Sequence, residues 1–203
     1  MKFSSGRPRV AFQGERGAFS EEAAIRLLGP DIELAPRPTF AALFKSVDEG
    51  MADHVLVPVE NSLIGAIRPA VDLFSATSWA TIGEVTLRIQ QHLIGCPGTV
   101  FETIETVESH QAALAQCKRF FLEHPRISRV ETEDTAGSVR RIIELGDGTR
   151  AAIASRRAAE IYGGTILREN LEDDPQNFTR FVLLSTESTS AWESAQLAAI
   201  SGK

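Results

Sequence analysis

The feature that most constrains the fold of this chain is a nearly regular alternation of short apolar runs with amphipathic segments. Residues 10–12, 55–59 and 151–153 are apolar runs of strand length. Between such runs lie segments, for example residues 40–47, whose apolar positions recur at helical spacing. Strands that alternate with helices are joined by crossover connections. The pattern therefore predicts an α/β fold with mostly parallel sheets.

Local signals predict where several helices begin. Ser20 and Thr39 precede apolar periodic segments, and we expect each to be a helix N-cap. Thr135 is expected to begin a further helix that runs to residue 145. Residues 111–122 predict one continuous helix, and residues 84–94 one long extended segment.

Two segments predict a division into two lobes. The extended segment 84–94 can carry the chain out of a first lobe, and the strand that begins near Thr179 can carry it back. We expect lobe 1 to comprise residues 8–84 plus 181–203, and lobe 2 to comprise residues 85–180. Two α/β lobes joined by two crossovers would enclose a cleft.

Composition and charge exclude several classes of function. The chain has 203 residues, 43% of them hydrophobic, and a net charge of −6. An acidic chain is a poor partner for nucleic acid, because phosphate contacts need clustered Lys and Arg. No apolar run reaches the length of a signal peptide or a membrane span. We therefore expect a cytoplasmic protein without nucleic acid or membrane partners.

The cysteines and histidines predict no metal site. Cys96 and Cys117 are far apart, and the four histidines are scattered. This spacing matches no zinc template, and we expect two buried, reduced thiols.

Small polar residues follow several predicted strands at the point where a helix begins. They are Ser20, Asn61 with Ser62, Ser109 and Thr135. The first turn of a helix has unpaired N–H groups that bind carboxylates and phosphates, and ligands of open α/β sheets lie at this end of the strands. An acidic chain can thus hold an anion with local groups. Taken singly, Ser20 and Thr135 are more typical of simple N-caps than of a ligand site, and Asn61 is more typical of a turn.

Residues 177–181 place the hydroxyl of Thr179 beside a permanent cation, Arg180, between Phe178 and Phe181. A hydroxyl in a partly dry, cationic setting can donate a proton to a leaving group or a hydrogen bond to an anion. The same segment, taken alone, is typical of a loop that enters a strand and carries a surface arginine.

Five blocks in order resemble the prephenate dehydratases and the related arogenate dehydratases. The blocks span residues 11–21, 57–65, 109–117, 151–163 and 170–181. The second block reads Val-Pro-Val-Glu-Asn-Ser-Leu-Ile-Gly, and the last ends in the Asn-x-Thr-Arg-Phe pattern of that family. Gln111 and Ala112 depart from the Pro-Gln of the third block, whereas Ser109, His110 and Gln116 match it. The resemblance covers residues 10–184.

The resemblance implies a carbon–oxygen lyase that converts prephenate, a dianion, to phenylpyruvate, water and carbon dioxide. Aromatisation of the ring drives that reaction, so we expect no cofactor and no metal. Thr179 is implied as the proton donor to the departing hydroxyl. Arg180 is implied either to orient Thr179 or to bind a carboxylate. The other residues implied at the substrate are Asn61, Ser62, Ser109, Gln116, Thr135, Ser20, Phe181 and Glu60, the last in support of Asn61.

Two alternatives stay open at this point. An arogenate dehydratase would act on a substrate with an amine in place of the ketone. A non-catalytic module that binds small anions would use the same two-lobed architecture, which is like that of type II periplasmic binding proteins.

Further expectations concern assembly and the ends of the chain. We expect a homodimer. Residues 182–203 are too few for the ACT regulatory domain found in many members of that family, so we expect neither an ACT nor a chorismate mutase domain. Residues 191–200 predict a short helix.

Overall fold

The computed structural model describes residues 7–186, and their contacts divide the chain into two compact units. Within the described part, unit 1 comprises residues 7–13, 23–87 and 179–186, and unit 2 comprises Gly14–Glu22 and Arg88–Phe178. The chain passes between the units near residues 87–88 and 178–179. It also passes between them at 13–14 and 22–23, because a short loop and helix start belong to unit 2 although their flanks belong to unit 1.

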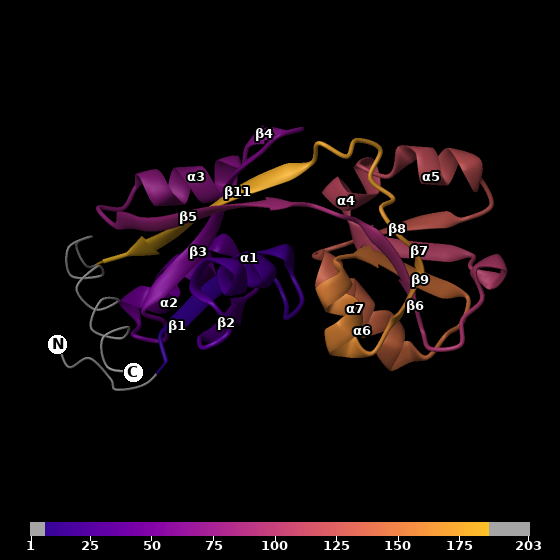
Figure 1. Ribbon diagram of the computed structural model, residues 1–203, viewed down its shortest axis with the longest axis horizontal. Coiled ribbons are helices and arrows are strands. Elements are labelled where there is room, and N and C mark those ends of the chain that lie inside the picture. Colours follow the sequence, from indigo (N-terminus) through magenta and orange to yellow (C-terminus); the bar gives the residue numbers. More distant parts are fainter. Residues whose placement is uncertain (1–6, 187–203) are drawn as a thin grey trace. The chain divides into compact units, whose positions relative to one another are not determined.

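Unit 1 is built on a mixed sheet in the order β2-β1-β3-β11-β5, with the short β4 beside β3 (Figure 1). β1 pairs in parallel with β2 and β3, whereas β11 runs antiparallel to β3. The strands are β1 (Arg9–Gln13), β2 (Glu33–Arg37), β3 (His54–Asn61), β4 (Gly65–Ala66), β5 (Ala80–Arg88) and β11 (Phe178–Ser185). The helices are α1 (Phe19–Leu28), α2 (Phe40–Asp48) and α3 (Arg68–Ser75).

The core of unit 1 lies between this sheet and its helices. One cluster joins α2 and α3 to every second residue of the central strands, as expected from the alternation of side chains along a strand. Its buried members are Ala11, Leu43, Phe44, Ala52, Val55, Val57, Val59, Ala70, Val182 and Leu184. Along β11, Phe181 and Leu183 alternate with Val182 and Leu184 and are also buried.

Unit 2 has a second mixed sheet in the order β10-β6-β9-β7-β8. β7 is parallel to β8 and β9, and β6 is antiparallel to β9 and β10. The strands are β6 (His92–Gly95), β7 (Thr106–His110), β8 (Ser128–Thr132), β9 (Arg150–Ala154) and β10 (Thr165–Arg168). The helices are α4 (Gln111–Ala115), α5 (Lys118–Glu123), α6 (Thr135–Leu145) and α7 (Arg156–Tyr162), with a short 3-10 helix, η1 (Phe101–Thr103).

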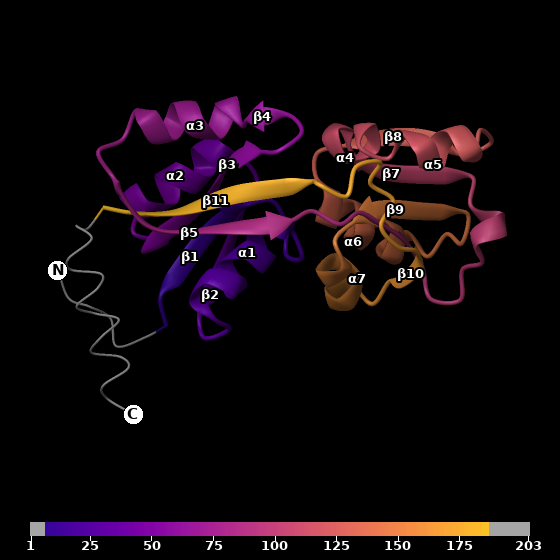
Figure 2. The same ribbon diagram turned by 45° about the horizontal axis from the view of Figure 1, so that its top comes forward.

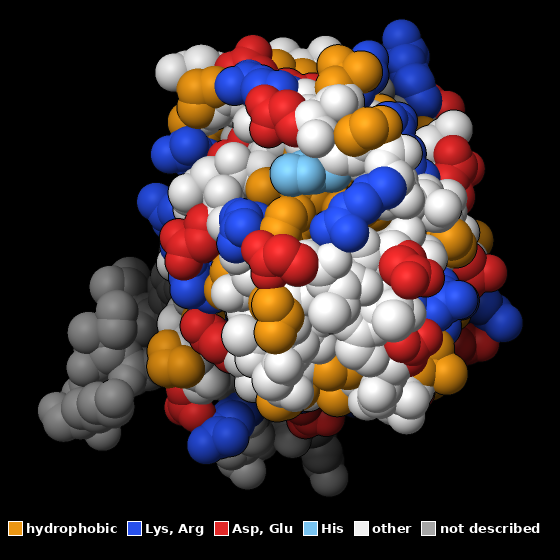
Figure 3. All heavy atoms as spheres, turned by 90° about the vertical axis from the view of Figure 1, so that its right-hand side faces the viewer, with side chains coloured by type: hydrophobic (Ala, Val, Ile, Leu, Met, Phe, Trp, Pro, Cys, Tyr) orange, Lys and Arg blue, Asp and Glu red, His pale blue; other side chains and the backbone are white. Residues whose placement is uncertain are grey.

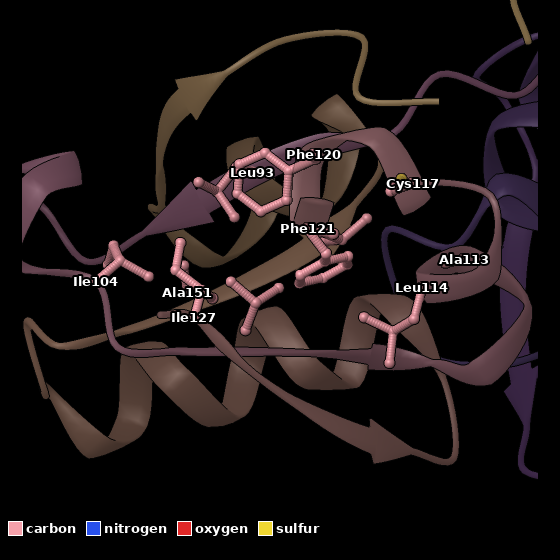
Figure 4. Packing of buried hydrophobic residues seen from close by; sticks show 11 residues of the cluster. Leu93, Ile104, Ala113, Leu114, Cys117, Phe120, Phe121, Ile127 and Ala151 are labelled. Carbon is pink, nitrogen blue, oxygen red and sulfur yellow. The ribbon is translucent and has the colours of Figure 1, made fainter. Parts of the chain in front are cut away.

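Helices cover both faces of the unit 2 sheet, with α4 and α5 on one face and α6 and α7 on the other (Figures 1 and 2). On the surface of unit 2 seen in Figure 3, basic and acidic side chains are interspersed. Figure 4 shows the cluster beneath α4 and α5, where Phe120 and Phe121 pack edge to face 5.1 Å apart against Leu93 and Ile127. Unit 2 therefore has an apolar core of its own.

The structure confirms the α/β prediction and refines it. The sheets are mixed rather than mostly parallel, because β11 returns beside β3 and β6 pairs with β9 in the antiparallel sense. The single extended segment predicted at 84–94 is two strands, β5 and β6, each in its own sheet. β2 and β10 were not predicted, because their sequences are short and show little alternation of apolar and polar residues.

Two helix predictions are confirmed. Thr39 is the N-cap of α2, and its hydroxyl accepts from the Ala42 N–H at 3.1 Å. Helix α6 covers the predicted residues 135–145, and the side chain that caps it is Asp134.

Two other helix predictions are wrong. Ser20 is not an N-cap, because it lies inside α1, which begins one residue earlier. The predicted helix 111–122 is broken into α4 and α5, because the Asp173 carboxylate, distant in sequence, accepts the first backbone N–H groups of α5. The second error comes from a contact between segments distant in sequence, which local signals do not contain.

Several smaller predictions concern thiols, membranes and the tail. Cys96 and Cys117 are both free and buried, as predicted. No helix among the described residues is long and apolar enough to span a bilayer. The predicted helix at 191–200 lies outside the described residues.

Candidate functional site

In unit 1, the structure places Thr179 directly opposite Asn61 on the paired strands β11 and β3. The Asn61 amide Nδ2 donates to the Thr179 hydroxyl oxygen at 3.0 Å, across 118 residues of sequence. Both side chains are buried, and Thr179 is 7% exposed. Because the threonine oxygen accepts this bond, its own O–H proton is directed to another acceptor. The pair is therefore a buried hydroxyl whose oxygen accepts from Asn61 and whose proton points away from that amide.

The other end of the Asn61 amide holds the turn that follows β3. Its Oδ1 accepts from the backbone N–H groups of Leu63 and Ile64 at 3.0 and 3.3 Å. An amide whose oxygen accepts from backbone cannot turn over without losing both bonds, so its NH₂ group stays directed at Thr179. Ser62 lies exposed in this turn.

Arg180 and Glu60 lie on the opposite face of the same two strands. They are the neighbouring cross-strand pair, and Arg180 Nη2 donates to Glu60 Oε2 at 3.3 Å. Arg180 also forms a 3.6 Å ion pair with Glu84, and its side chain is 43% exposed. Successive residues of a strand point to opposite faces. Phe181 follows after a register shift in the ladder and is 2% exposed in the core of unit 1.

In unit 2, Gln116 is held by two other amides at the end of α4. Its Oε1 accepts from Asn177 Nδ2 at 3.0 Å and from Gln91 Nε2 at 3.3 Å. Since both donors bind the oxygen, the Gln116 NH₂ group is directed away from them. Gln116 is half-buried, so this NH₂ group can donate to a ligand oxygen.

The other two residues expected in unit 2 have different surroundings. The Ser109 hydroxyl is fully buried and donates to the Ile153 carbonyl at 2.6 Å, which ties β7 to β9. Thr135 is the first residue of α6, half-buried, next to the capping carboxylate of Asp134. Burial raises the pKa of Asp134 even though the Gly137 N–H donates to it. Ser109 is thus engaged within unit 2, whereas Thr135 lies at a helix start.

The loop that precedes α1 is fixed to unit 2 around Glu21. The fully buried Glu21 carboxylate accepts from the Gly17 N–H at 3.0 Å, from Arg16 at 2.7 Å and from Arg157 at 2.7 Å. Burial would raise the pKa of Glu21, but these donors outweigh burial and hold it below its ordinary value. The buried Ser20 is adjacent to this carboxylate in the first turn of α1.

Gly17 shows why this loop needs glycine. Its φ is +85°, and a Cβ at this position would lie 2.7 Å from the Cα of Ala158. The Ser155 hydroxyl donates to the Gly17 carbonyl at 2.6 Å and accepts from the Ala158 N–H, so it also caps α7. The first block of the sequence is therefore a docking element for α7.

Sequence reasoning missed Asn177, Gln91 and Glu172, all buried in unit 2. The Glu172 carboxylate accepts from the Gln91 backbone N–H at 2.9 Å and pairs with Arg88 at 3.6 Å. Asn177 belongs to the Asn-x-Thr-Arg-Phe pattern, and its position there was the one available signal. Nothing local marks Gln91 or Glu172, because their partners are 25 and 81 residues away.

These features define a class of protein: an α/β chain of two units with an oriented buried hydroxyl in one and an oriented amide donor in the other. The chain matches the family model for prephenate dehydratase over residues 10–189. It belongs to the prephenate dehydratase family.

Curated relatives agree with this assignment. A bifunctional chorismate mutase/prephenate dehydratase of Neisseria gonorrhoeae is 38% identical over 183 residues, which are 90% of this chain and 51% of that protein. Arogenate dehydratase 1 of Petunia hybrida is 41% identical over 180 residues, 88% of this chain and 42% of that protein. The chain thus spans about half the length of the curated relatives that it matches.

Two solved structures share the fold. A prephenate dehydratase from Arthrobacter aurescens, in complex with L-Phe, is 29% identical with a TM-score of 0.80, and the match covers 89% of this chain and 61% of that one. A protein described as a novel type of quorum quenching acylase is 33% identical with a TM-score of 0.79, over 89% of this chain and 64% of that one.

Proposed function

We propose that this chain catalyses the decarboxylative dehydration of prephenate to phenylpyruvate. The observation that carries the proposal is the buried Thr179 hydroxyl, which Asn61 orients within the Asn-x-Thr-Arg-Phe segment of a prephenate dehydratase family member. The relatives named for this activity support it.

The reaction requires one proton transfer, and we assign Thr179 as its donor. The ring C–O bond breaks, and its electron pair leaves with the hydroxyl group, which takes a proton from Thr179 to become water. The ring carboxylate leaves as carbon dioxide, and the electrons of its C–C bond complete the aromatic ring. The Thr179 alkoxide recovers a proton from solvent. A threonine hydroxyl is a weak acid, so the transfer comes late in C–O cleavage.

The remaining groups are proposed to bind. The Gln116 NH₂ group donates to a carboxylate or ketone oxygen, and Ser62, Thr135 and the start of α6 are further candidates for the anionic groups. Ser109 and Ser20 support the site from within unit 2. Arg180 and Glu60 support the strand pair from the face opposite Thr179, and Phe181 anchors β11 in the core.

Arogenate is the second candidate substrate. The Petunia hybrida relative is named an arogenate dehydratase and is 41% identical. The chemistry at the ring is the same for both substrates. Prephenate carries a ketone in its side chain, and arogenate carries an amine there.

An acylase activity is a weaker candidate, although one structural relative is described as an acylase. Amide hydrolysis by a hydroxyl nucleophile needs a base that takes its proton. The partner of Thr179 is the Asn61 NH₂ group, which is a donor and takes no proton. The geometry therefore favours Thr179 as a proton donor.

The testing experiment is turnover of prephenate by the 203-residue chain, followed by the ultraviolet absorbance of phenylpyruvate. Parallel assays use arogenate and an N-acyl amide. We expect turnover of prephenate with a kcat/KM above that for arogenate and none of the amide. Binding of prephenate without turnover would overturn the proposal in favour of a non-catalytic binding module.

Three further points are proposals of the same kind. We propose that the protein is cytoplasmic, that it forms a homodimer, and that residues 8–84 with 181–203 and residues 85–180 act as its two lobes. Light scattering tests the dimer and limited proteolysis tests the lobes.

A further inference from the structure

We infer that Asn177, assisted by Gln91, is a positioning residue that fixes the orientation of the Gln116 amide so that its NH₂ group faces the ligand. This inference rests on the proposed function for its catalytic consequence. Its geometric content concerns unit 2 alone.

The contacts at Gln116 define one orientation of its amide. Asn177 Nδ2 and Gln91 Nε2 both donate to Gln116 Oε1, at 3.0 and 3.3 Å. If the Gln116 amide turned by 180°, its own NH₂ group would face Asn177 Nδ2, and that bond would be lost. A bond to Gln91 would survive only if the Gln91 amide turned as well and presented its Oε1, which is unpartnered among the described residues, so the fixed orientation depends on Asn177. Asn177 is fully buried and makes the shorter bond, so we assign it the larger share.

Backbone hydrogen bonds hold all three amides in place. The backbone carbonyl of Asn177 accepts from the Ile89 N–H at 2.8 Å. The backbone carbonyl of Gln91 accepts from the Leu171 N–H, and the backbone carbonyl of Gln116 accepts from the Asp173 N–H, both at 2.7 Å. The segment 171–177 is thus bonded along the ends of β5 and α4, and the orienting donors cannot move away without breaking main-chain bonds.

A fixed NH₂ donor selects for an oxygen acceptor. A carboxylate or a ketone oxygen satisfies it, whereas an ammonium group does not. Gln116 therefore distinguishes ligand groups only while Asn177 holds its amide in this orientation.

The testing substitution is Asn177→Asp, which keeps the shape of the side chain and exchanges the donor for an acceptor. The Gln116 NH₂ group is then expected to turn towards the introduced carboxylate, and its carbonyl oxygen to face the ligand anion. We expect KM for prephenate to rise by roughly 10- to 100-fold, since a donor to an anion is replaced by an acceptor.

Asn170→Asp is the matched control for this substitution. It adds the same charge in the same loop and keeps the Asn170 Oδ1 that accepts from Gln90. KM for prephenate should change little in this control, because the Gln116 amide keeps both of its donors.

A double-variant cycle separates positioning from a structural role. In a Gln116→Ala background the amide is absent, so adding Asn177→Asp should change KM by less than about 2-fold. If Asn177→Asp raises KM as much in that background as in the parent chain, the inference is wrong.

A second readout does not depend on turnover. In the ¹⁵N-labelled parent chain, side-chain amide exchange should be slow for Asn177 and fast for the Gln116 NH₂ group. In Asn177→Asp the Gln116 NH₂ group should become protected. An inactive parent chain that still shows this reversal would overturn the proposed function and keep the positioning role. Unchanged exchange of the Gln116 NH₂ group would overturn the positioning role.

Discussion

Units 1 and 2 each contain a polar group that an asparagine orients, but the two groups differ in what they can do. In unit 1, Asn61 donates to the Thr179 oxygen and leaves a hydroxyl proton to be given away. In unit 2, Asn177 donates to the Gln116 oxygen and leaves an NH₂ group, which donates hydrogen bonds but does not lose a proton at neutral pH. The same arrangement therefore leaves an O–H donor in unit 1, to which we assign the proposed proton transfer, and an NH₂ donor in unit 2, to which we assign the proposed binding.

Among the substitutions that test this comparison, removal of the Thr179 hydroxyl is expected to change the activity most. We expect Thr179→Ala to lower kcat by ~10²–10⁴-fold, the usual worth of a positioned general acid, with the fold intact by circular dichroism. Thr179→Ser should retain part of the activity because it keeps the hydroxyl. A kcat for Thr179→Ala close to that of the parent chain would remove the proton-donor role from unit 1.

Asn61→Asp isolates the orienting bond in unit 1. The substitution keeps the oxygen that accepts from Leu63 and Ile64 but removes the donor to Thr179. We expect kcat to fall by roughly 10- to 100-fold, in line with loss of one hydrogen bond at a buried site. Ile64→Ser, in the same exposed turn, is the control and should leave kcat unchanged. If Asn61→Asp changed KM alone, Asn61 would resemble the binding group of unit 2.

Acid should destabilise both units through one buried histidine each. Burial lowers the pKa of His54 in unit 1 and of His92 in unit 2 below the ordinary value of about 6.5. Below that pH the two histidines bind protons in the unfolded chain but stay neutral in the folded chain. The free energy of unfolding therefore falls as pH drops from about 7 towards 5. The pKa of the Glu21 carboxyl is lowered in the folded chain, so the stability that this group contributes is lost only at still lower pH.

Urea unfolding at a series of pH values measures this dependence. His92→Gln should flatten the part that comes from unit 2, because glutamine does not titrate. A free energy of unfolding that rises as the pH is lowered from about 7 to 5 would contradict the prediction.

The smallest expected effect concerns Arg180. Its side chain lies on the face of the strand pair opposite to that of Thr179 and contacts Glu60 and Glu84. We therefore expect Arg180→Met to change kcat and KM by less than about 3-fold. Steady-state kinetics with prephenate check this, with Glu60→Gln as the matched partner variant. A large rise in KM for Arg180→Met alone would show that Arg180 binds a substrate carboxylate.

The order of motifs along the chain could predict part of the site. Thr179 and Asn61 stand in patterns that resemble one family, and both prove to be buried and bonded to each other. The role of Arg180 stayed open, because the sequence does not show which face of a strand pair each residue occupies. The register pairs Thr179 with Asn61 and Arg180 with Glu60, and it puts Arg180 on the face of the strand pair opposite to that of Thr179.

Other parts of the site depended on contacts between distant segments. Local signals put a helix cap at Ser20, but Glu21 and Gly17 are fixed by Ser155 and Arg157, about 140 residues further along the chain. Local signals also made 111–122 one helix, whereas Asp173 begins a new helix at Lys118. Propensity and spacing contain no information on such partners.

The sequence by itself determined the alternation of strands and helices and the position of a hydroxyl in the Asn-x-Thr-Arg-Phe segment. These follow from periodicity and from neighbours along the chain. Only the tertiary structure decided which asparagine orients which group, and which faces of the strands Thr179 and Arg180 occupy. The physical reason is that hydrogen-bond direction and strand register are set by residues that meet only after the chain has folded.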